Sequence, residues 1–148
     1  MAITVVCLEC GQANRIPEAK LDAEPKCARC GAGLIKGTPT EVSFEILSKA
    51  ARMDGIPLIV DFWAAWCGPC RMMAPEFASA AKALKGTARF IKLDTEAHPQ
   101  AGERYGIRGI PLLIAFAGGR EVKRQSGAIP ASKIIEWASG ISQAKGDA

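Results

Sequence analysis

The sequence of 148 residues contains no long apolar run, which excludes one class of protein at the outset. Its most apolar windows, 56–66 and 110–117, are much shorter than the roughly 20 residues that cross a bilayer. The N-terminus also lacks the basic residues of a secretion signal, and its short apolar stretch ends at Cys7. We therefore expect a cytoplasmic protein that does not bind membranes.

The sequence also has no long run of like charges and contains only one histidine. The formal net charge is +4, but residues 1–40 hold five basic and four acidic side chains and the remainder is mixed. This distribution is typical of a solvated surface, so we expect no nucleic-acid partner. The only histidine, His98, lies in a polar loop beside Pro99, which argues against a Cys-His hydrolase. The chain also lacks a dinucleotide fingerprint.

Six cysteines occur as three Cys-x-x-Cys pairs, and none follows Cys70. A secreted disulfide scaffold would distribute its cysteines differently. In a reducing compartment, such pairs bind metals or take part in catalysis more often than they form structural disulfides. The spacing of the pairs and the residues around each one therefore indicate whether it binds a metal or exchanges disulfides.

The first two pairs repeat one pattern, Cys7-x-x-Cys10-Gly and Cys27-x-x-Cys30-Gly. Each predicts a turn that presents two sulfurs to a metal, with the glycine allowing a positive φ. The interval between the pairs suits a four-cysteine site, so we predict one Zn²⁺ ion bound by all four. Iron in the same cage, or two disulfides, are the alternatives. The segment lacks apolar residues for a core, so metal binding would supply its folding energy.

Gly37 and Pro39 mark a linker, which divides the chain into a zinc-binding domain over 1–37 and a second domain over 38–148. Hydrophobic periodicity in the second domain predicts the order α-β-α-β-α-β-β-α, a mixed sheet with helices on both faces. The elements are expected at 41–53, 58–63, 67–85, 88–93, 100–105, 112–117, 120–126 and from residue 130.

The third pair, Cys67 and Cys70, follows an apolar strand and opens a helix, which predicts disulfide exchange. The helix N-terminus favours the thiolate of Cys67. Cys67 is therefore expected to face outward and attack a substrate disulfide, and the sheltered Cys70 to resolve the mixed disulfide. Between them, Pro69 supplies no amide proton to hold a thiolate, which favours reducing power.

Two residues elsewhere fit the same chemistry. Asp61 interrupts the apolar strand 58–63, where a charged carboxylate is costly, so we expect a raised pKa and a role as proton acceptor for Cys70. A solvated position at a sheet edge is the alternative. Pro111 enters the strand 112–117 and is a candidate for a cis peptide bond, beside backbone groups that could pair with an extended substrate.

The stretch Val60-Asp61-Phe62-Trp63-Ala64-Ala65-Trp66-Cys67-Gly68-Pro69-Cys70, followed later by residues 105–111, resembles the thioredoxin family. The four-cysteine extension resembles the bacterial thioredoxin 2 group. This resemblance implies a thioredoxin fold over roughly residues 41–142, with a small zinc-ribbon-like domain before it.

The resemblance also implies roles for individual residues. Cys67 would be the nucleophile, Cys70 the resolving thiol, Asp61 the buried proton acceptor with Lys92 as its charge neighbour, and Pro111 a cis-proline opposite the thiols. The surface that receives substrate would consist of Trp66, Gly68, Pro69, Gly109 and Ile110. Leu112 stands where the family often has threonine, which bears on substrate preference.

We therefore predict a monomeric protein-disulfide reductase that works by thiol–disulfide exchange and takes electrons from an NADPH-dependent thioredoxin reductase. A rival hypothesis is a zinc-ribbon adaptor or chaperone that uses the thioredoxin domain as a scaffold. A third possibility is that oxidation of the four N-terminal cysteines releases zinc and changes activity.

Overall fold

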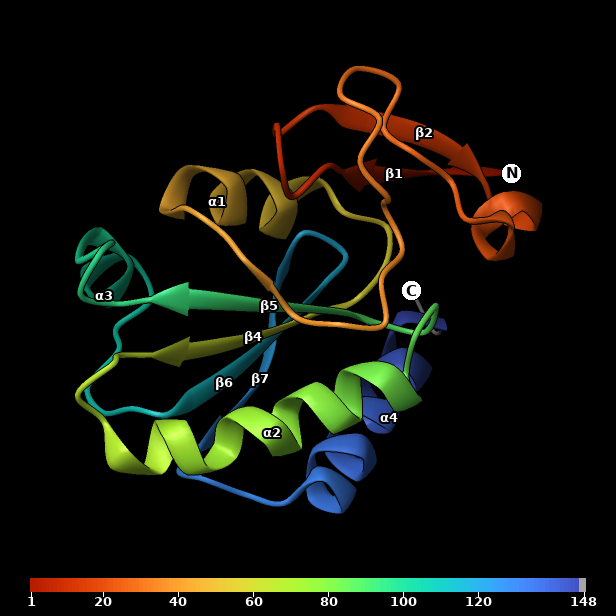
Figure 1. Cartoon of the computed structure of the whole chain (residues 1–148). Coiled ribbons are helices and arrows are strands. Elements are labelled where there is room, and N and C mark those ends of the chain that lie inside the picture. Colours follow the sequence, from red (N-terminus) through yellow and green to blue (C-terminus); the bar gives the residue numbers. More distant parts are fainter. Residues whose placement is uncertain (147–148) are drawn as a thin grey trace.

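Two β-sheets organise the computed structural model, which describes the backbone of residues 1–146 and the side chains of residues 1–141 (Figure 1). The smaller sheet pairs β1 (Ala2–Val6) antiparallel with β2 (Ala13–Pro17), and a short 3-10 helix, η1 (Glu18–Ala23), follows. The larger sheet has the strand order β3-β5-β4-β6-β7. Its strands are β3 (Thr40–Glu41), β4 (Leu58–Trp63), β5 (Arg89–Asp94), β6 (Leu112–Ala117) and β7 (Arg120–Ser126).

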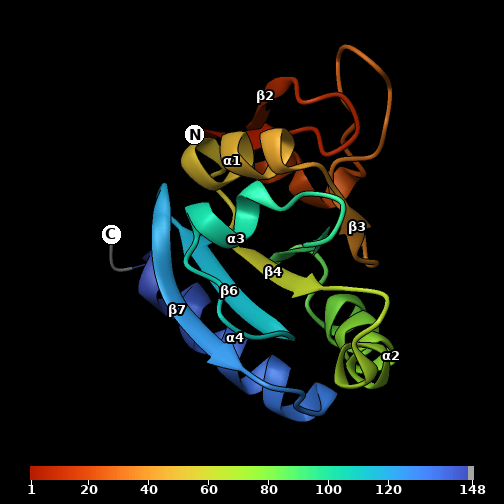
Figure 2. The ribbon, with the colours of Figure 1, turned by 90° about the vertical axis from the view of Figure 1, so that its left-hand side faces the viewer.

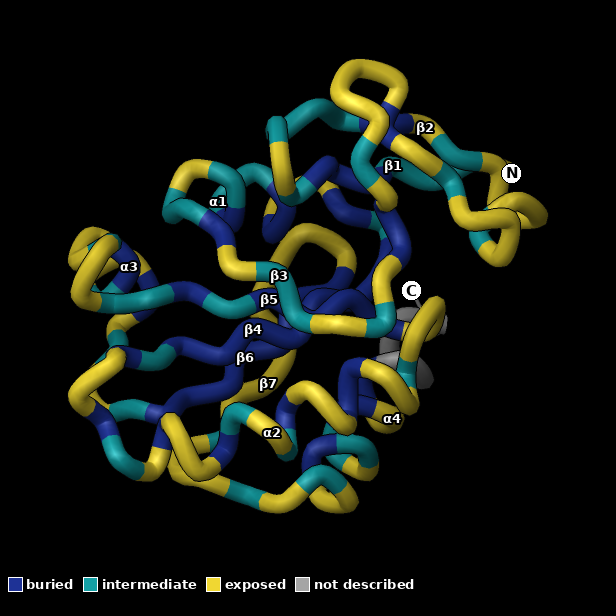
Figure 3. Tube along the Cα trace, in the orientation of Figure 1, coloured by how far each residue is buried: buried dark blue, intermediate teal, exposed yellow. Residues whose placement is uncertain are grey.

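Helices cover both faces of the larger sheet, as predicted (Figures 1 and 2). They are α1 (Phe44–Met53), α2 (Gly68–Ala83), α3 (Gln100–Arg104) and α4 (Ala131–Gly146). Val60 packs in the cluster that includes α1 and α3, whereas Ile59 packs in the cluster that includes α2 and α4, because successive strand residues point to opposite faces. Strands β3, β5 and β4 run parallel to one another, β6 runs antiparallel to β4, and β7 runs antiparallel to β6, so the sheet is mixed. The central strands are largely buried (Figure 3).

The start of the first helix differs from the prediction. Ser43 caps α1, since its hydroxyl accepts a hydrogen bond from the Ile46 amide at 3.2 Å, and the helix begins at Phe44. Glu41 therefore lies outside the helix, in β3, where it pairs with Lys92 of β5. The prediction of a helix from residue 41 was wrong because a serine cap and a long-range strand pairing outweigh the helical periodicity.

The N-terminal segment, residues 1–37, has a small apolar cluster, contrary to the expectation that it lacks one. Val5, Leu34 and Ile35 are buried there together with the cysteines at positions 7 and 27. Ile56, from the loop before β4, completes the cluster. The segment thus buries its apolar residues by sharing them with the following part of the chain.

A buried ion pair attaches this segment to the larger sheet. Both carboxylate oxygens of Asp54 accept hydrogen bonds from Arg89 Nη1, at 2.9 and 2.8 Å. Arg89 Nη2 also donates to the Val6 carbonyl at 2.9 Å, and the Val6 amide donates to Asp54 at 2.8 Å. Only 5% of the Arg89 side chain and 2% of the Asp54 side chain are exposed. The ion pair therefore fixes the end of β1 to the start of β5.

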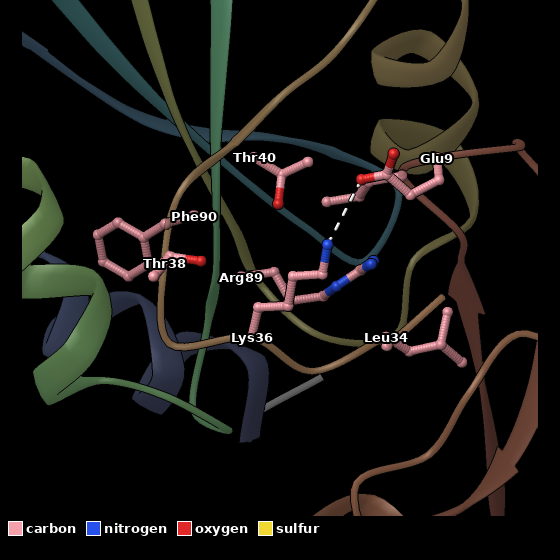
Figure 4. Close-up of a pocket in the computed structure, with 9 residues that line it drawn as sticks. Glu9, Leu34, Lys36, Thr38, Thr40, Arg89 and Phe90 are labelled. Carbon is pink, nitrogen blue, oxygen red and sulfur yellow. Dashed lines mark hydrogen bonds and ion pairs between the residues drawn. The ribbon is translucent and has the colours of Figure 1, made fainter. Parts of the chain in front are cut away.

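Close packing continues around this attachment. The Gly55 amide donates to the Thr4 carbonyl at 2.8 Å, and a Cβ atom at position 55 would lie 2.8 Å from the Cβ of Ile3, so a larger residue does not fit there. Figure 4 shows the neighbouring junction, where Lys36 pairs with Glu9 at 3.4 Å. The cavity there measures about 10 Å³, the lower limit for one water molecule.

The N-terminal segment and the Cys67–Cys70 turn lie at opposite ends of the larger sheet (Figure 1). Arg89, which holds the segment, begins β5, whereas Cys67 follows the end of the parallel strand β4. Six-residue strands span roughly 20 Å, so the segment leaves the turn uncovered. Within the part of the chain that the structure describes, no helix has the length and apolar character needed to cross a membrane.

We expect Arg89→Met to lower the free energy of unfolding by about 3–5 kcal/mol, because it removes the buried counter-charge of Asp54 and a donor to Val6. Urea denaturation followed by circular dichroism measures this loss. Lys85→Met is the matched control, since Lys85 pairs with Glu24 at 2.9 Å on the surface, and its loss should stay below about 1 kcal/mol. Equal losses in the two variants would contradict the role given to the buried pair.

Candidate active site and candidate metal centre

Cys67 and Cys70 form a disulfide in the turn between β4 and α2, with their Cα atoms 5.2 Å apart. Cys67 is the N-cap of α2, and its Sγ accepts a hydrogen bond from the Cys70 amide at 3.2 Å. Pro69 fits the first turn, where its missing amide proton costs nothing. The Cys67 sulfur therefore sits at the helix N-terminus, where backbone amides favour negative charge.

The two cysteines differ less in exposure than expected. Cys67 is 3% exposed and Cys70 is 2% exposed, so the expectation of an outward-facing Cys67 is wrong for this oxidised form. The reason is that the Cys67 sulfur faces the Cys70 amide on one side and the Ile110 carbonyl oxygen, 3.7 Å away, on the other. Their exposed neighbours are Trp66 and Met72, at 67% and 74%. The position at the helix N-terminus, and not exposure, distinguishes the two sulfurs.

The residues predicted to receive substrate surround this turn. Gly68 and Pro69 lie within it, and the Ile110 carbonyl faces the Cys67 sulfur. The Ile110–Pro111 peptide bond is cis, as predicted. Gly109, the residue before this pair, is exposed. The structure thus brings the segment 109–111 and the Cys67–Cys70 turn together, although they are about 40 residues apart in the sequence.

Asp61 is completely buried, so the alternative of a solvated edge residue is wrong. Its strand, β4, is central in the sheet, and neither carboxylate oxygen has a hydrogen-bond partner among the described residues. Burial raises the pKa of Asp61 to about 7, while the positive charge of Lys92 opposes the rise and the negative charge of Glu41 adds to it. A carboxyl group that titrates near neutral pH can exchange a proton during catalysis.

Strand alternation places Asp61 beneath α2, the helix that carries Cys70. Ile59, two residues earlier in β4, packs with Met73 and Phe77 of α2, and residues i and i+2 of a strand point to the same face. Lys92, which pairs with Asp61 across β5, is on this face as well. The carboxyl group, the ammonium group and the helix of the dithiol thus share one face of the sheet.

Glu41 also belongs to this region of the structure, although no sequence motif predicts it there. The Trp63 indole nitrogen donates to its Oε1 and Oε2 at 3.1 and 3.3 Å, and the Asp94 amide donates to Oε2 at 2.9 Å. The Lys92 ammonium lies 4.9 Å from the centroid of the Trp63 ring. Ser43, a strong helix cap, was the available signal that Glu41 lies before the helix and not in it.

The four remaining cysteines gather into one cluster, in which all the sulfur atoms lie within 4.8 Å of one another. The Sγ atoms of Cys7 and Cys30 are 3.6 Å apart, and those of Cys10 and Cys27 are 3.7 Å apart. A tetrahedral Zn²⁺ ion with Zn–S bonds of about 2.3 Å requires sulfur separations of about 3.8 Å. The donor set therefore fits zinc, and it fits iron of the same geometry equally well.

The turns of this cluster have the expected knuckle conformation. Gly11 and Gly31 adopt φ values of 84° and 80°, which glycine tolerates. The Cys30 and Arg29 amides favour the thiolate of Cys27 and lower its pKa to about 6, although burial opposes this. The deprotonated form that these amides favour is the form in which a cysteine binds a metal.

Comparisons with known proteins agree with this geometry. Residues 38–140 match the family model "Thioredoxin", and residues 6–32 match "Thioredoxin 2, N-terminal". Thioredoxin C-3 of Corynebacterium nephridii is 39% identical over 133 residues, which cover 90% of this chain and 91% of that protein. The chloroplastic M-type thioredoxin of Chlamydomonas reinhardtii is 32% identical over 82% of this chain and 89% of its own length.

Solved structures show the same fold. Chloroplastic thioredoxin z superimposes with a TM-score of 0.65 at 31% identity, over 72% of this chain and 96% of its own. The thioredoxin of Malassezia sympodialis gives a TM-score of 0.65 at 28% identity, over 73% of this chain and 94% of its own. The predicted fold, a mixed sheet flanked by helices with a cysteine-rich segment before it, is confirmed.

The buried carboxyl group makes stability depend on pH. In the unfolded chain Asp61 releases its proton near pH 3.8, whereas in the folded protein it does so near pH 7. The folded state therefore binds more protons between these values, and stability falls as pH rises through this interval. At pH 8 the cost is on the order of 4 kcal/mol, because the pKa rises from 3.8 to about 7 on folding.

We expect Asp61→Asn to stabilise the oxidised protein at pH 8 by this amount and to have little effect at pH 3.5, as measured by urea denaturation at each pH. Asp22→Asn, at an exposed position, controls for the change in net charge. A stabilisation of the same size at both pH values would disprove the raised pKa.

Proposed function

This chain belongs to the thioredoxin family, and from that premise we propose how its residues reduce protein disulfides. It is a thiol–disulfide oxidoreductase whose substrates are protein disulfides. The observation that carries the proposal is the Cys67–Cys70 disulfide at the N-terminus of α2, with the Cys67 sulfur hydrogen-bonded to the Cys70 amide. This sulfur is the one that can best bear negative charge in the reduced protein.

In the proposed reaction, the Cys67 thiolate attacks one sulfur of the substrate disulfide, and the other substrate sulfur leaves as a thiolate. A mixed disulfide then joins Cys67 to the substrate. Cys70 loses its proton and attacks the Cys67 sulfur, which forms the Cys67–Cys70 disulfide and releases the second substrate thiolate. The substrate gains two electrons and the protein dithiol loses two.

Asp61 is the proposed acceptor of the Cys70 proton. Its position beneath α2 and its pKa of about 7 support this role, because a base that titrates near the working pH transfers protons efficiently. Lys92 is the proposed charge neighbour of Asp61, since the two are register partners on the same face.

The proposed docking surface consists of Trp66, Gly68, Pro69, Gly109 and Ile110, with Pro111 beside them. Trp66 supplies exposed apolar area, and the Ile110 carbonyl lies next to the Cys67 sulfur. An extended segment of a substrate protein placed between them would bring its disulfide to that sulfur.

An NADPH-dependent thioredoxin reductase in the cytoplasm is the proposed electron donor. The chain itself carries no dinucleotide fingerprint. We further propose that the protein is a monomer. We propose no nucleic-acid or membrane partner, because positive and negative charges are mixed along the chain.

The N-terminal segment is proposed to be a zinc-binding domain over 1–37, which precedes a thioredoxin domain over 38–148, whose last two residues lie outside the described part of the chain. Cys7, Cys10, Cys27 and Cys30 would hold one Zn²⁺ ion, and bound zinc would serve to fix the two knuckle turns. The attachment through Arg89, at the end of the sheet remote from the Cys67–Cys70 turn, supports a structural role.

The assignment of the two thiols is tested by insulin reduction coupled to NADPH and a thioredoxin reductase. We expect Cys67→Ser to show no turnover above the uncatalysed reaction, because the nucleophile is lost. Cys70→Ser should instead accumulate a mixed disulfide with the substrate, visible by mass spectrometry. Retention of turnover by Cys67→Ser would rule out this mechanism.

Metal analysis of the full chain tests the proposed zinc site. We expect one zinc per chain, and its loss in the double variant Cys10→Ser/Cys27→Ser, with a lower melting temperature but turnover within about twofold of the wild type. A full-length chain with Ala28→Ser serves as the control with an intact ligand set. Bound iron would refute the choice of metal. Loss of turnover on zinc removal would refute a purely structural role.

A further inference from the structure

Three charged side chains lie in one row across the larger sheet. Glu41 of β3 is the register partner of Lys92 in β5, and Lys92 is the register partner of Asp61 in β4. Register partners in neighbouring strands point to the same face. The row is therefore carboxyl, ammonium, carboxyl, on the face that α2 covers, with Glu41 at the outer end and Asp61 at the buried end.

Within the described residues, Lys92 and Glu41 are the groups whose charges act on Asp61, and Asp94, the register partner of Trp63, lies on the same face further along β5. On the other side of Asp61, β6 presents Leu113, and Gln125 of β7, one strand further, is uncharged. From above, α2, the helix that carries Cys70, contributes apolar side chains of the cluster around Ile59. The environment of Asp61 is thus apolar except along the row.

Among the described residues, the ammonium group of Lys92 does not donate a hydrogen bond to Asp61. It lies instead over the Trp63 ring, 4.9 Å from the ring centroid. Trp63 is in turn held by Glu41, which accepts its indole N–H at 3.1 Å. An ammonium group placed beside Asp61 would stabilise the carboxylate and weaken it as a base. The contact with the Trp63 ring, and the hydrogen bond by which Glu41 holds that ring, are the observed interactions that compete with such a placement.

Glu41 itself is held in place although it is largely exposed. Besides Trp63, the Asp94 amide donates to its Oε2 at 2.9 Å. These bonds locate its negative charge at the outer end of the row. Glu41 also belongs to β3, the short strand that follows the linker from the N-terminal segment.

We propose that Glu41 is a positioning residue for the resolving step, which acts by holding Trp63 and Lys92 so that Asp61 keeps its affinity for the Cys70 proton. The proposal rests on the function proposed above for Asp61. It adds Glu41, a residue of the strand that follows the linker, to the residues that act on the dithiol.

The direct test is a titration of Asp61 in the full-length oxidised protein, followed by the ¹³C resonance of its carboxyl group. Glu41→Gln retains an oxygen that accepts the Trp63 N–H but removes the charge. We expect the midpoint of Asp61 to fall by roughly half a pH unit, since Lys92 is then released toward Asp61 and a like charge is lost. Glu41→Asp, which keeps the charge, should restore most of the wild-type midpoint.

Glu45→Gln is the matched control, because it removes the same charge from an exposed position in the first turn of α1. Its Asp61 midpoint should equal that of the wild type. An unchanged midpoint in Glu41→Gln, or an equal shift in Glu45→Gln, would overturn the proposal. Circular dichroism on each variant verifies that it is folded.

The pH dependence of the resolving step provides a functional readout. Resolution of a mixed disulfide should speed up as Asp61 loses its proton, and the midpoint of this rise should move down in Glu41→Gln and up in Lys92→Met. If Asp61→Asn keeps the wild-type pH profile, the proposed role of Asp61 fails and the proposal for the resolving step fails with it. The titration would still show whether Glu41 controls the proton affinity of Asp61, so the two failures are distinguishable.

Discussion

The burial of one carboxyl group, Asp61, is the constraint around which the site is arranged. Its strand lies at the centre of the sheet, and neither of its oxygens has a hydrogen-bond partner among the described residues. Such a group is costly when charged, and it is retained in the same layer as the helix that carries the dithiol. The loss of stability as pH rises from about 4 to 7 and a pKa of about 7, which suits a proton acceptor, are two consequences of the same desolvation.

The chain separates its two kinds of cysteine chemistry in space. The cluster of four cysteines belongs to a segment held by Arg89 and Asp54 at one end of the sheet, and the disulfide follows the other end of β4. Four sulfurs at tetrahedral spacing suit a metal ion. Two sulfurs at a helix N-terminus suit thiol–disulfide exchange with a substrate sulfur. Glu41 lies in β3, the strand that leads from the segment into the larger sheet. Its proposed role would connect this strand to the chemistry of the dithiol.

Much of this could be predicted from the sequence, because the signals were local. The apolar run around Asp61 predicted both its strand and its burial, and the repeated knuckle pattern predicted the cluster of four sulfurs. The failures concern contacts between distant residues. Arg89 and Asp54 look like surface charges until the fold pairs them, and Glu41 continued a helical pattern until β5 paired with it. The similar exposure of Cys67 and Cys70 also depends on a distant segment, the Ile110 carbonyl.

The most direct measurement of the central claim is an infrared titration of the oxidised wild-type protein in ²H₂O, with the oxidised Asp61→Asn protein as the reference. The oxidised form is suitable because neither active-site cysteine titrates in it. The account predicts a difference band from one protonated carboxyl group that persists through pH 5 and disappears with a midpoint near pH 7. A band lost near pH 4, as for a solvated aspartate, would contradict it.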